Sequence, residues 1–171
     1  TGFFVKLYNL ALPGKPLTGY QLFMFFLPMM IFHPGFVLGA EWSIKAELMA
    51  WSMFFIWAPL WDFLWFVLNP YYGLKNFKKS KVWCHAKSYW VFGLFPADYA
   101  KGVGVSMFLA YGASWVSNDF SVLINHLWLF GLFLFFTFIT IIIIAPLYQH
   151  WYKTMRLRDA RAKCEIFYHF D

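Results

Sequence analysis

Two polar sets interrupt an otherwise apolar chain, and each contains residues able to do acid–base or metal chemistry. Asp62 lies in the run Trp61-Asp62-Phe63-Leu64, and Glu47 precedes it by fifteen residues on what must be the same helix. An ionisable group in hydrocarbon costs at least ~2.5–3.5 kcal/mol, so each carboxylate needs a partner or a purpose. At a helical rise of ~1.5 Å per residue, the two carboxylates are roughly 22 Å apart. They cannot share one metal ion or one proton, so the sequence predicts two separate polar sites.

The first set centres on Asp62 and on the segment after its helix, residues 69–98. This segment mixes Lys and His with Trp and Tyr, which is typical of chain that lies flat in the lipid headgroup layer. If it folds back over the end of the helix, Asp62 can pair with His85 or with Lys101. We therefore take Asp62, His85 and Asp98 as the candidate catalytic residues.

Three interpretations of this first set are open. It is a catalytic or metal site, or a station on a proton or ion path. In the third interpretation, Asp62 only accepts a hydrogen bond from an indole or a backbone N–H and fixes how the helices pack.

The second set falls at the opposite ends of the predicted helices. Its two imidazoles and two carboxylates are residue types that bind zinc, copper or iron, so a transition metal is the cofactor they would suit. Their spacing matches no recognised metal signature. The alternative is that the acid before the last helix is a helix cap and that the imidazoles reach interfacial water. The candidate metal ligands are His33, Glu47, Asp119 and His126.

Composition decides which solvent these sites meet. The 171 residues are 61% hydrophobic and 25% aromatic with only 13% charged, which a soluble domain of this size could not bury. The lipid bilayer is therefore the expected first partner. The net charge of +6 is better explained by orientation in a bilayer than by nucleic-acid binding, which requires a solvated basic face.

Runs of about twenty apolar residues predict an all-α integral membrane fold. The third of the four predicted spans is rich in Gly, Ala and Ser, which allow helices to approach closely, so we expect it inside the bundle. Residues 20–148 would form one transmembrane domain. Its predicted helices are about 20–38, 44–68, 99–116 and 122–148.

The basic residues predict the orientation of these four helices. With both termini cytoplasmic, 13 of the 14 Lys and Arg residues fall on the inner side, and only Lys45 lies outside. The chain would then have a cytoplasmic N-terminal segment at 1–19 and a basic cytoplasmic tail at 149–171. An interfacial segment would connect the second and third helices. The expected localisation is integral to a membrane, with several passes.

One part of the chain resembles a known group of proteins. Residues 62–73 read Asp-Phe-Leu-Trp-Phe-Val-Leu-Asn-Pro-Tyr-Tyr-Gly, and Trp83-x-His85 and Pro96-x-Asp98-Tyr99 follow. These motifs resemble a group of uncharacterised small polytopic membrane proteins, over about a third of the chain. The resemblance brings no known chemistry, but it implies that Asp62, His85 and Asp98 act together.

The expected function follows from the chain's small size, aromatic surface and lack of familiar catalytic motifs. No nucleotide-binding, serine-hydrolase, zincin or iron–sulfur pattern occurs. We therefore expect a small subunit that packs against other membrane proteins and stabilises a larger complex, a membrane oxidoreductase being one class that fits. A membrane enzyme, metal-dependent through its Asp and His residues, is the alternative. A proton or ion pathway through Glu47 and Asp62 is a further one.

Overall fold

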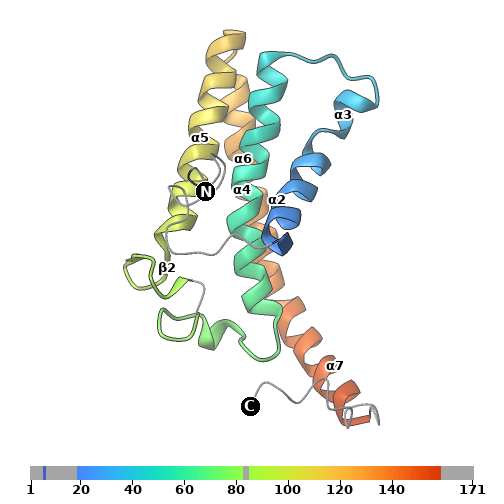
Figure 1. Cartoon of the computed structure of the whole chain (residues 1–171), viewed down its shortest axis with the longest axis vertical. Coiled ribbons are helices and arrows are strands. Elements are labelled where there is room, and N and C mark those ends of the chain that lie inside the picture. The colour runs from blue at the N-terminus through green and yellow to red at the C-terminus, as the bar shows by residue number, and fades with distance from the viewer. Residues whose placement is uncertain (1–5, 7–18, 83–84, 159–171) are drawn as a thin grey trace.

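The computed structural model describes residue 6 and residues 19–82 and 85–158, and within these ranges the chain is mostly helical. Most of the predicted N-terminal segment at 1–19, and residues 159–171 of the predicted tail, lie outside the described residues. Figure 1 shows long helices that run side by side, with an irregular segment gathered at one end of the bundle.

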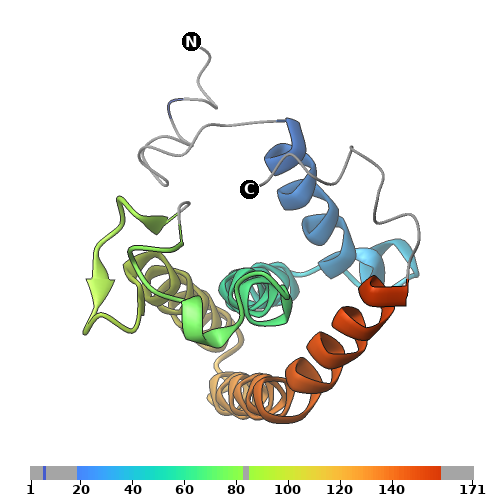
Figure 2. The same ribbon diagram turned by 90° about the horizontal axis from the view of Figure 1, so that it is seen from below.

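The central helix, α4, spans Ile44–Leu68, the same range as the second helix predicted from the sequence. Ser43 begins it, because its hydroxyl accepts a hydrogen bond from the N–H of Ala46 at 3.1 Å. Asn69 ends it, and Pro70 cannot continue the helix. α4 packs against α2, α5, α6 and α7, and Figure 2 shows it between them.

α5 (Ala97–Ser117) runs beside α4 and presents its small residues to it. Ser106, Ala110 and Ala113 are fully buried there. A Cβ at Gly102 would lie 3.2 Å from both the Phe55 carbonyl oxygen and Pro59 Cγ. The close approach expected from the small residues is therefore observed. The helix stands at the edge of the bundle rather than inside it, however, because its other face carries large exposed side chains.

The predicted first span contains two helices, α2 (Gly19–Phe32) and the short α3 (Pro34–Val37). They are separated at His33, where Pro34 interrupts the hydrogen-bonding pattern of the helix. α2 packs against α4, and the rings of Phe32 and Trp57 meet with their centroids 6.0 Å apart.

The last helical stretch is longer than the predicted 122–148. α6 (Ser121–Ile139) continues through a π-helical turn at Thr140–Ile144 into α7 (Ala145–Arg158). Pro146 accounts for the wide turn, because it lacks an N–H and its ring would clash with the carbonyl four residues earlier.

The connection between α4 and α5 is folded, and its residues 69–82 and 85–96 are called the cap below. It contains a short 3₁₀ turn, Leu74–Asn76, and a hairpin of β1 (Trp90–Val91) with β2 (Phe95–Pro96). The strands are antiparallel, with Trp90 opposite Pro96 and Val91 opposite Phe95. The cap lies at the Leu68 end of α4, where α7 also projects (Figure 1).

Two helices of the described chain are long and apolar enough to cross a membrane. They are α4 and the continuous helix from Ser121 to Leu157. Their exposed surfaces carry large apolar side chains, including Trp61, Phe136 and Ile142. The sequence expectation of membrane association is thus supported for these two helices.

The close contact between α5 and α4 can be tested at a glycine of α5. Gly102→Leu should destabilise the protein by about 1–3 kcal/mol, because its side chain would press on the backbone and on Pro59 of α4. Gly131→Leu, on α6, is the matched control, since a Cβ there meets nothing within 4 Å. Thermal unfolding in detergent should show a lower midpoint for Gly102→Leu alone. Equal midpoints for the two variants would contradict the observed packing.

Candidate functional site

A small aromatic core holds the cap against the end of α4. Phe66 of α4 packs with Phe77, Val82 and Trp90 of the cap, and all four side chains are buried. This core also places His85, whose buried ring meets that of Tyr99 edge to face and that of Phe66 at a tilt, with centroids 5.4 and 6.4 Å apart. The indole N–H of Trp90 donates to the His85 carbonyl oxygen at 3.1 Å. Both the backbone and the ring of His85 are therefore fixed.

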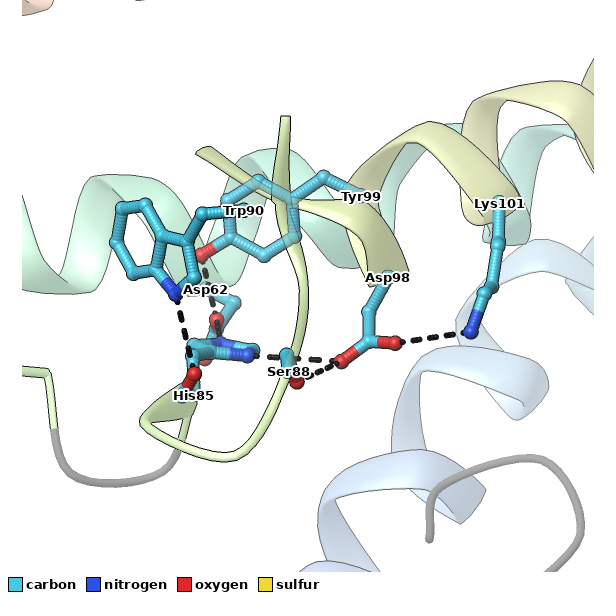
Figure 3. A network of polar contacts seen from close by, with 7 residues as sticks. All are labelled: Asp62, His85, Ser88, Trp90, Asp98, Tyr99 and Lys101. Carbon is cyan, nitrogen blue, oxygen red and sulfur yellow. Dashed lines mark hydrogen bonds and ion pairs between the residues drawn. The ribbon is translucent and has the colours of Figure 1, made fainter. Parts of the chain in front are cut away.

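His85 pairs with Asp62, which is one of the two pairings that the sequence predicted for this carboxylate. His85 Nε2 lies 2.7 Å from Asp62 Oδ2, and the Tyr99 hydroxyl donates to the same oxygen at 2.6 Å (Figure 3). The two side chains differ in exposure, at 4% for His85 and 42% for Asp62. The carboxylate therefore has one oxygen held by two donors while part of its surface faces out of the fold.

Asp98 completes the set on the other side of the imidazole. Its Oδ2 lies 3.7 Å from His85 Nδ1 and accepts a hydrogen bond from the Ser88 hydroxyl at 2.8 Å. Its Oδ1 lies 3.4 Å from Lys101 Nζ. The structure therefore pairs Lys101 with Asp98, one turn away on α5, and not with Asp62 (Figure 3).

The result is a carboxylate–imidazole–carboxylate line that joins α4, the cap and α5. His85 Nε2 is at hydrogen-bonding distance from Asp62, so the ring can share a proton with that carboxylate, whereas Nδ1 faces Asp98 at 3.7 Å, which is an ion-pair distance and not a hydrogen bond. The same contacts also tie three segments together, because each partner comes from a different part of the chain. The geometry thus suits acid–base chemistry and structural support.

The second polar set does not assemble as one group. His33 and Glu47 meet, with Nε2 3.3 Å from Oε1. Glu47 also accepts hydrogen bonds from the indole N–H groups of Trp51 at 2.8 Å and Trp42 at 3.1 Å. His33 Nδ1 lies 2.7 Å from the Met29 carbonyl oxygen. Glu47 is therefore satisfied by three neighbours at the Ile44 end of α4.

Asp119 lies close to the start of α6, where the alternative interpretation placed a helix cap. Phe120 is the residue directly before the helix and makes no side-chain capping hydrogen bond, but Asp119 Oδ1 accepts one from the N–H of Ser121, the first residue of α6, at 2.9 Å. Hydrogen bonds from the side chain and backbone of Ser121 hold the pKa of Asp119 below its usual value.

His126 lies in the interior and not at interfacial water, where the sequence reasoning expected it. It is 1% exposed, and its Nε2 lies 2.9 Å from the Ser106 hydroxyl. Ser106 in turn donates to the Ser52 carbonyl oxygen at 2.7 Å, so three helices are linked. Because the single hydroxyl proton goes to that carbonyl, His126 Nε2–H is the donor to Ser106. Sequence spacing could not show this, since it depends on which face of α6 meets α5.

Within residues 19–82 and 85–158, no group of three or more His, Cys, Asp or Glu side chains is placed to hold a metal ion. The metal hypothesis for His33, Glu47, Asp119 and His126 therefore has no support from the described side chains. Cys84 lies outside them.

Three contributors to the first site were not assigned a role from the sequence. They are Ser88, Trp90 and Tyr99. Tyr99 follows Asp98 directly in the Pro96-x-Asp98-Tyr99 motif, which is the one signal that pointed to it. The roles of Ser88 and Trp90 depend on the hairpin, whose strands of two residues are too short to show an alternating pattern.

The contact between Asp62 and the cap predicts how one substitution affects local stability. In Asp62→Asn the acceptor loses its charge, and we expect the 85–99 region to open about 1 kcal/mol more easily, or roughly five times as often. Hydrogen exchange of peptides covering residues 85–99 measures this opening. Asp119→Asn, at the other end of the bundle, is the matched control and should leave that exchange unchanged. Equal exchange in Asp62→Asn and the unsubstituted protein would contradict the contact.

Comparison with known proteins gives no family for this arrangement. No protein-family model, curated protein or solved structure matches the chain. The function of the site is therefore inferred from its own geometry.

Proposed function

We propose that the chain crosses a membrane four times and serves as a subunit of a larger membrane complex. α4 and the 121–157 helix supply two of the spans, α5 is a third because it lies along α4, and α2 with α3 is the first. The charges support one orientation. The cap and the end of α7 carry Lys and Arg, whereas Lys45 stands alone at the opposite end of α4. By the positive-inside rule, the cap faces the cytoplasm.

The observation that supports a role as a subunit is the outer face of α5. Gly104, Phe108, Tyr111 and Trp115 follow one another at intervals of four, three and four residues, so they form one stripe on the helix. Phe108 and Trp115 are each 73% exposed, and Tyr111 is 49% exposed. We call these four residues the α5 outer stripe.

Two properties of the α5 outer stripe favour a protein neighbour. α5 is long enough to cross a membrane, yet it is not among the described helices that are also apolar enough to do so. A neighbouring protein helix would therefore be a more favourable environment for α5 than lipid. The stripe also combines open space at a glycine with aromatic side chains, and these are the residue types that helix interfaces use in membranes and in protein complexes.

Co-purification from native membranes under mild detergent tests the subunit proposal. The chain should elute with partner proteins, in a particle whose protein mass, without the detergent, exceeds the 20.3 kDa of one chain. Phe108→Ala combined with Trp115→Ala should weaken the association by about 2 kcal/mol or more, roughly thirtyfold in affinity.

Trp128→Ala combined with Phe135→Ala is the matched control, because these exposed aromatic side chains lie on α6. The control should keep the partners. A particle containing only one copy of the chain, or equal loss from both double variants, would contradict the proposal.

The Asp62–His85–Asp98 line favours a second candidate, an acid–base or proton-transfer role at the cap. The observation behind it is the difference in exposure along the line. A half-exposed carboxylate leads to a buried imidazole and then to Asp98, which is 17% exposed. Such an order would carry a proton from the surface at Asp62 to the buried imidazole, with Asp98 beyond it.

Proton flux into liposomes that contain the purified protein, with any partners, separates the two candidates. For proton transfer, Asp62→Asn and His85→Gln should each lower the flux by about 100-fold while co-purification is unchanged. Asp119→Asn should keep the full flux. If flux is the same in all three variants, the line is structural only.

A further inference from the structure

The hairpin of the cap ends in a strained turn with an aromatic residue at its centre. The Leu94 N–H donates to the Val91 carbonyl oxygen at 2.9 Å and closes this turn. Its two central residues, Phe92 and Gly93, have φ angles of 49° and 72°. Positive φ at both central positions is the pattern of a type I′ turn, for which Asn-Gly is the preferred sequence. Glycine adopts such angles freely, whereas a bulky residue such as Phe adopts them only under strain.

The side chain at this strained position is not buried within the cap. Phe92 is 91% exposed, which is the highest value among the large apolar side chains that the structure describes. Leu94 is 67% exposed, whereas Trp90 at the base of the hairpin belongs to the buried aromatic core. Packing within the cap therefore does not explain why Phe occupies a position that favours Asn.

The contacts between α5 and α4 give the level of the hairpin along the bundle. A Cβ at Gly102 of α5 would touch Pro59 of α4, and the Tyr99 hydroxyl donates to Asp62, so the two helices run antiparallel in this register. Ala97, the first residue of α5, is therefore roughly 6–8 Å from the end of α4, on the side of the bundle interior. The hairpin lies directly before this residue.

This level corresponds to the boundary between lipid acyl chains and headgroups. α4 has 25 residues and is about 37 Å long, compared with about 30 Å for the hydrocarbon layer. With α4 centred in the bilayer, each of its ends extends roughly 3–4 Å beyond the hydrocarbon, and the hairpin lies just inside the hydrocarbon edge. Figure 1 and Figure 2 both place the hairpin on the outer side of α5, away from α4. It is therefore at the periphery of the bundle.

The composition of the hairpin favours lipid over a protein as the neighbour of this turn. Residues 90–97 contain no charged side chain, and their one side chain with a hydrogen-bonding group is Trp90, whose indole N–H donates to the His85 carbonyl oxygen. The N–H groups of Gly93 and Leu94 are bonded within the hairpin. Protein interfaces combine apolar contact with direct hydrogen bonds, whereas acyl chains require only apolar surface.

We propose that the hairpin turn inserts into the bilayer, with Phe92 and Leu94 among the acyl chains of the leaflet on the cap side. Removal of the Phe92 ring from water offsets the strain in its backbone, and the turn anchors the cap at the membrane surface. The inference rests on the membrane placement given under the proposed function. It does not depend on the α5 outer stripe or on the Asp62–His85–Asp98 line.

A spin label at the turn tests the insertion in liposomes that contain the purified protein, with any partners. In a background with Cys84→Ser and Cys164→Ser, Leu94→Cys carries the label, and labelled Lys78→Cys is the aqueous reference. The label at position 94 should collide more often with dissolved oxygen than with a water-soluble nickel chelate, and the label at position 78 should show the reverse. Equal access of the chelate to both labels would overturn the proposal. A label at position 94 that neither reagent reaches would overturn it in favour of a protein neighbour.

Phe92→Asn separates insertion of the turn from its folding. Because a type I′ turn prefers Asn at this position, hydrogen exchange of residues 85–99 in the detergent-purified protein should be no faster than without the substitution. Without the phenyl ring, the ratio of inserted to aqueous turn should fall about tenfold, measured as greater access of the chelate to the label at position 94.

Leu157→Asn is the matched control, since Leu157 at the end of α7 is 89% exposed but lies outside the hairpin. This control should leave access to the label at position 94 unchanged. Faster exchange in Phe92→Asn would contradict the strained turn, and unchanged access of the chelate in that variant would contradict insertion of Phe92.

Membrane placement is checked separately by alkaline extraction of the membranes. Protein that stays in the membrane while the chelate reaches both labels equally would contradict the insertion alone. Protein released by the alkaline wash would contradict the membrane placement and with it the insertion.

Discussion

The carboxylate of Asp62 is the constraint on which the rest of this fold depends. It lies near the end of a long apolar helix, and although its side chain is 42% exposed, one of its oxygens is held by two described donors. These donors, His85 and Tyr99, come from the cap and from the start of α5. Both contacts form because the chain folds back after α4 and begins α5 beside it. The aromatic core around Phe66 then encloses the junction.

Several features of the fold could be predicted from the sequence. The range of α4 could be predicted because Ser43 caps its start and Asn69-Pro70 end its apolar run. The partnership of Asp62 with His85 was one of two pairings that the depth of the acid suggested. The small residues of α5 indicated close packing, and that packing is observed on α4. In each case the signal was local, or followed from the cost of a single acid within an apolar run.

Features that depend on how helices rotate against one another were not predictable. His126 was expected near interfacial water, but α6 turns it inward to Ser106. α5 was expected inside the bundle, although its aromatic side chains face outward. Lys101 was one of the two partners expected for Asp62, but it pairs with Asp98 on its own helix. The last helix also continues beyond the predicted span, so that Tyr152 of α7 meets Tyr71 of the cap.

We propose that the bundle carries its basic, aromatic cap on one side of a membrane, and site-directed labelling tests that claim most directly. In a background with Cys84→Ser and Cys164→Ser, single cysteines would replace Lys45 and Lys78. An impermeant maleimide should label Lys45→Cys in intact cells, and Lys78→Cys only after the membrane is permeabilised. Labelling of both positions in intact cells would contradict a membrane crossing by α4, and the reverse pattern would contradict the orientation.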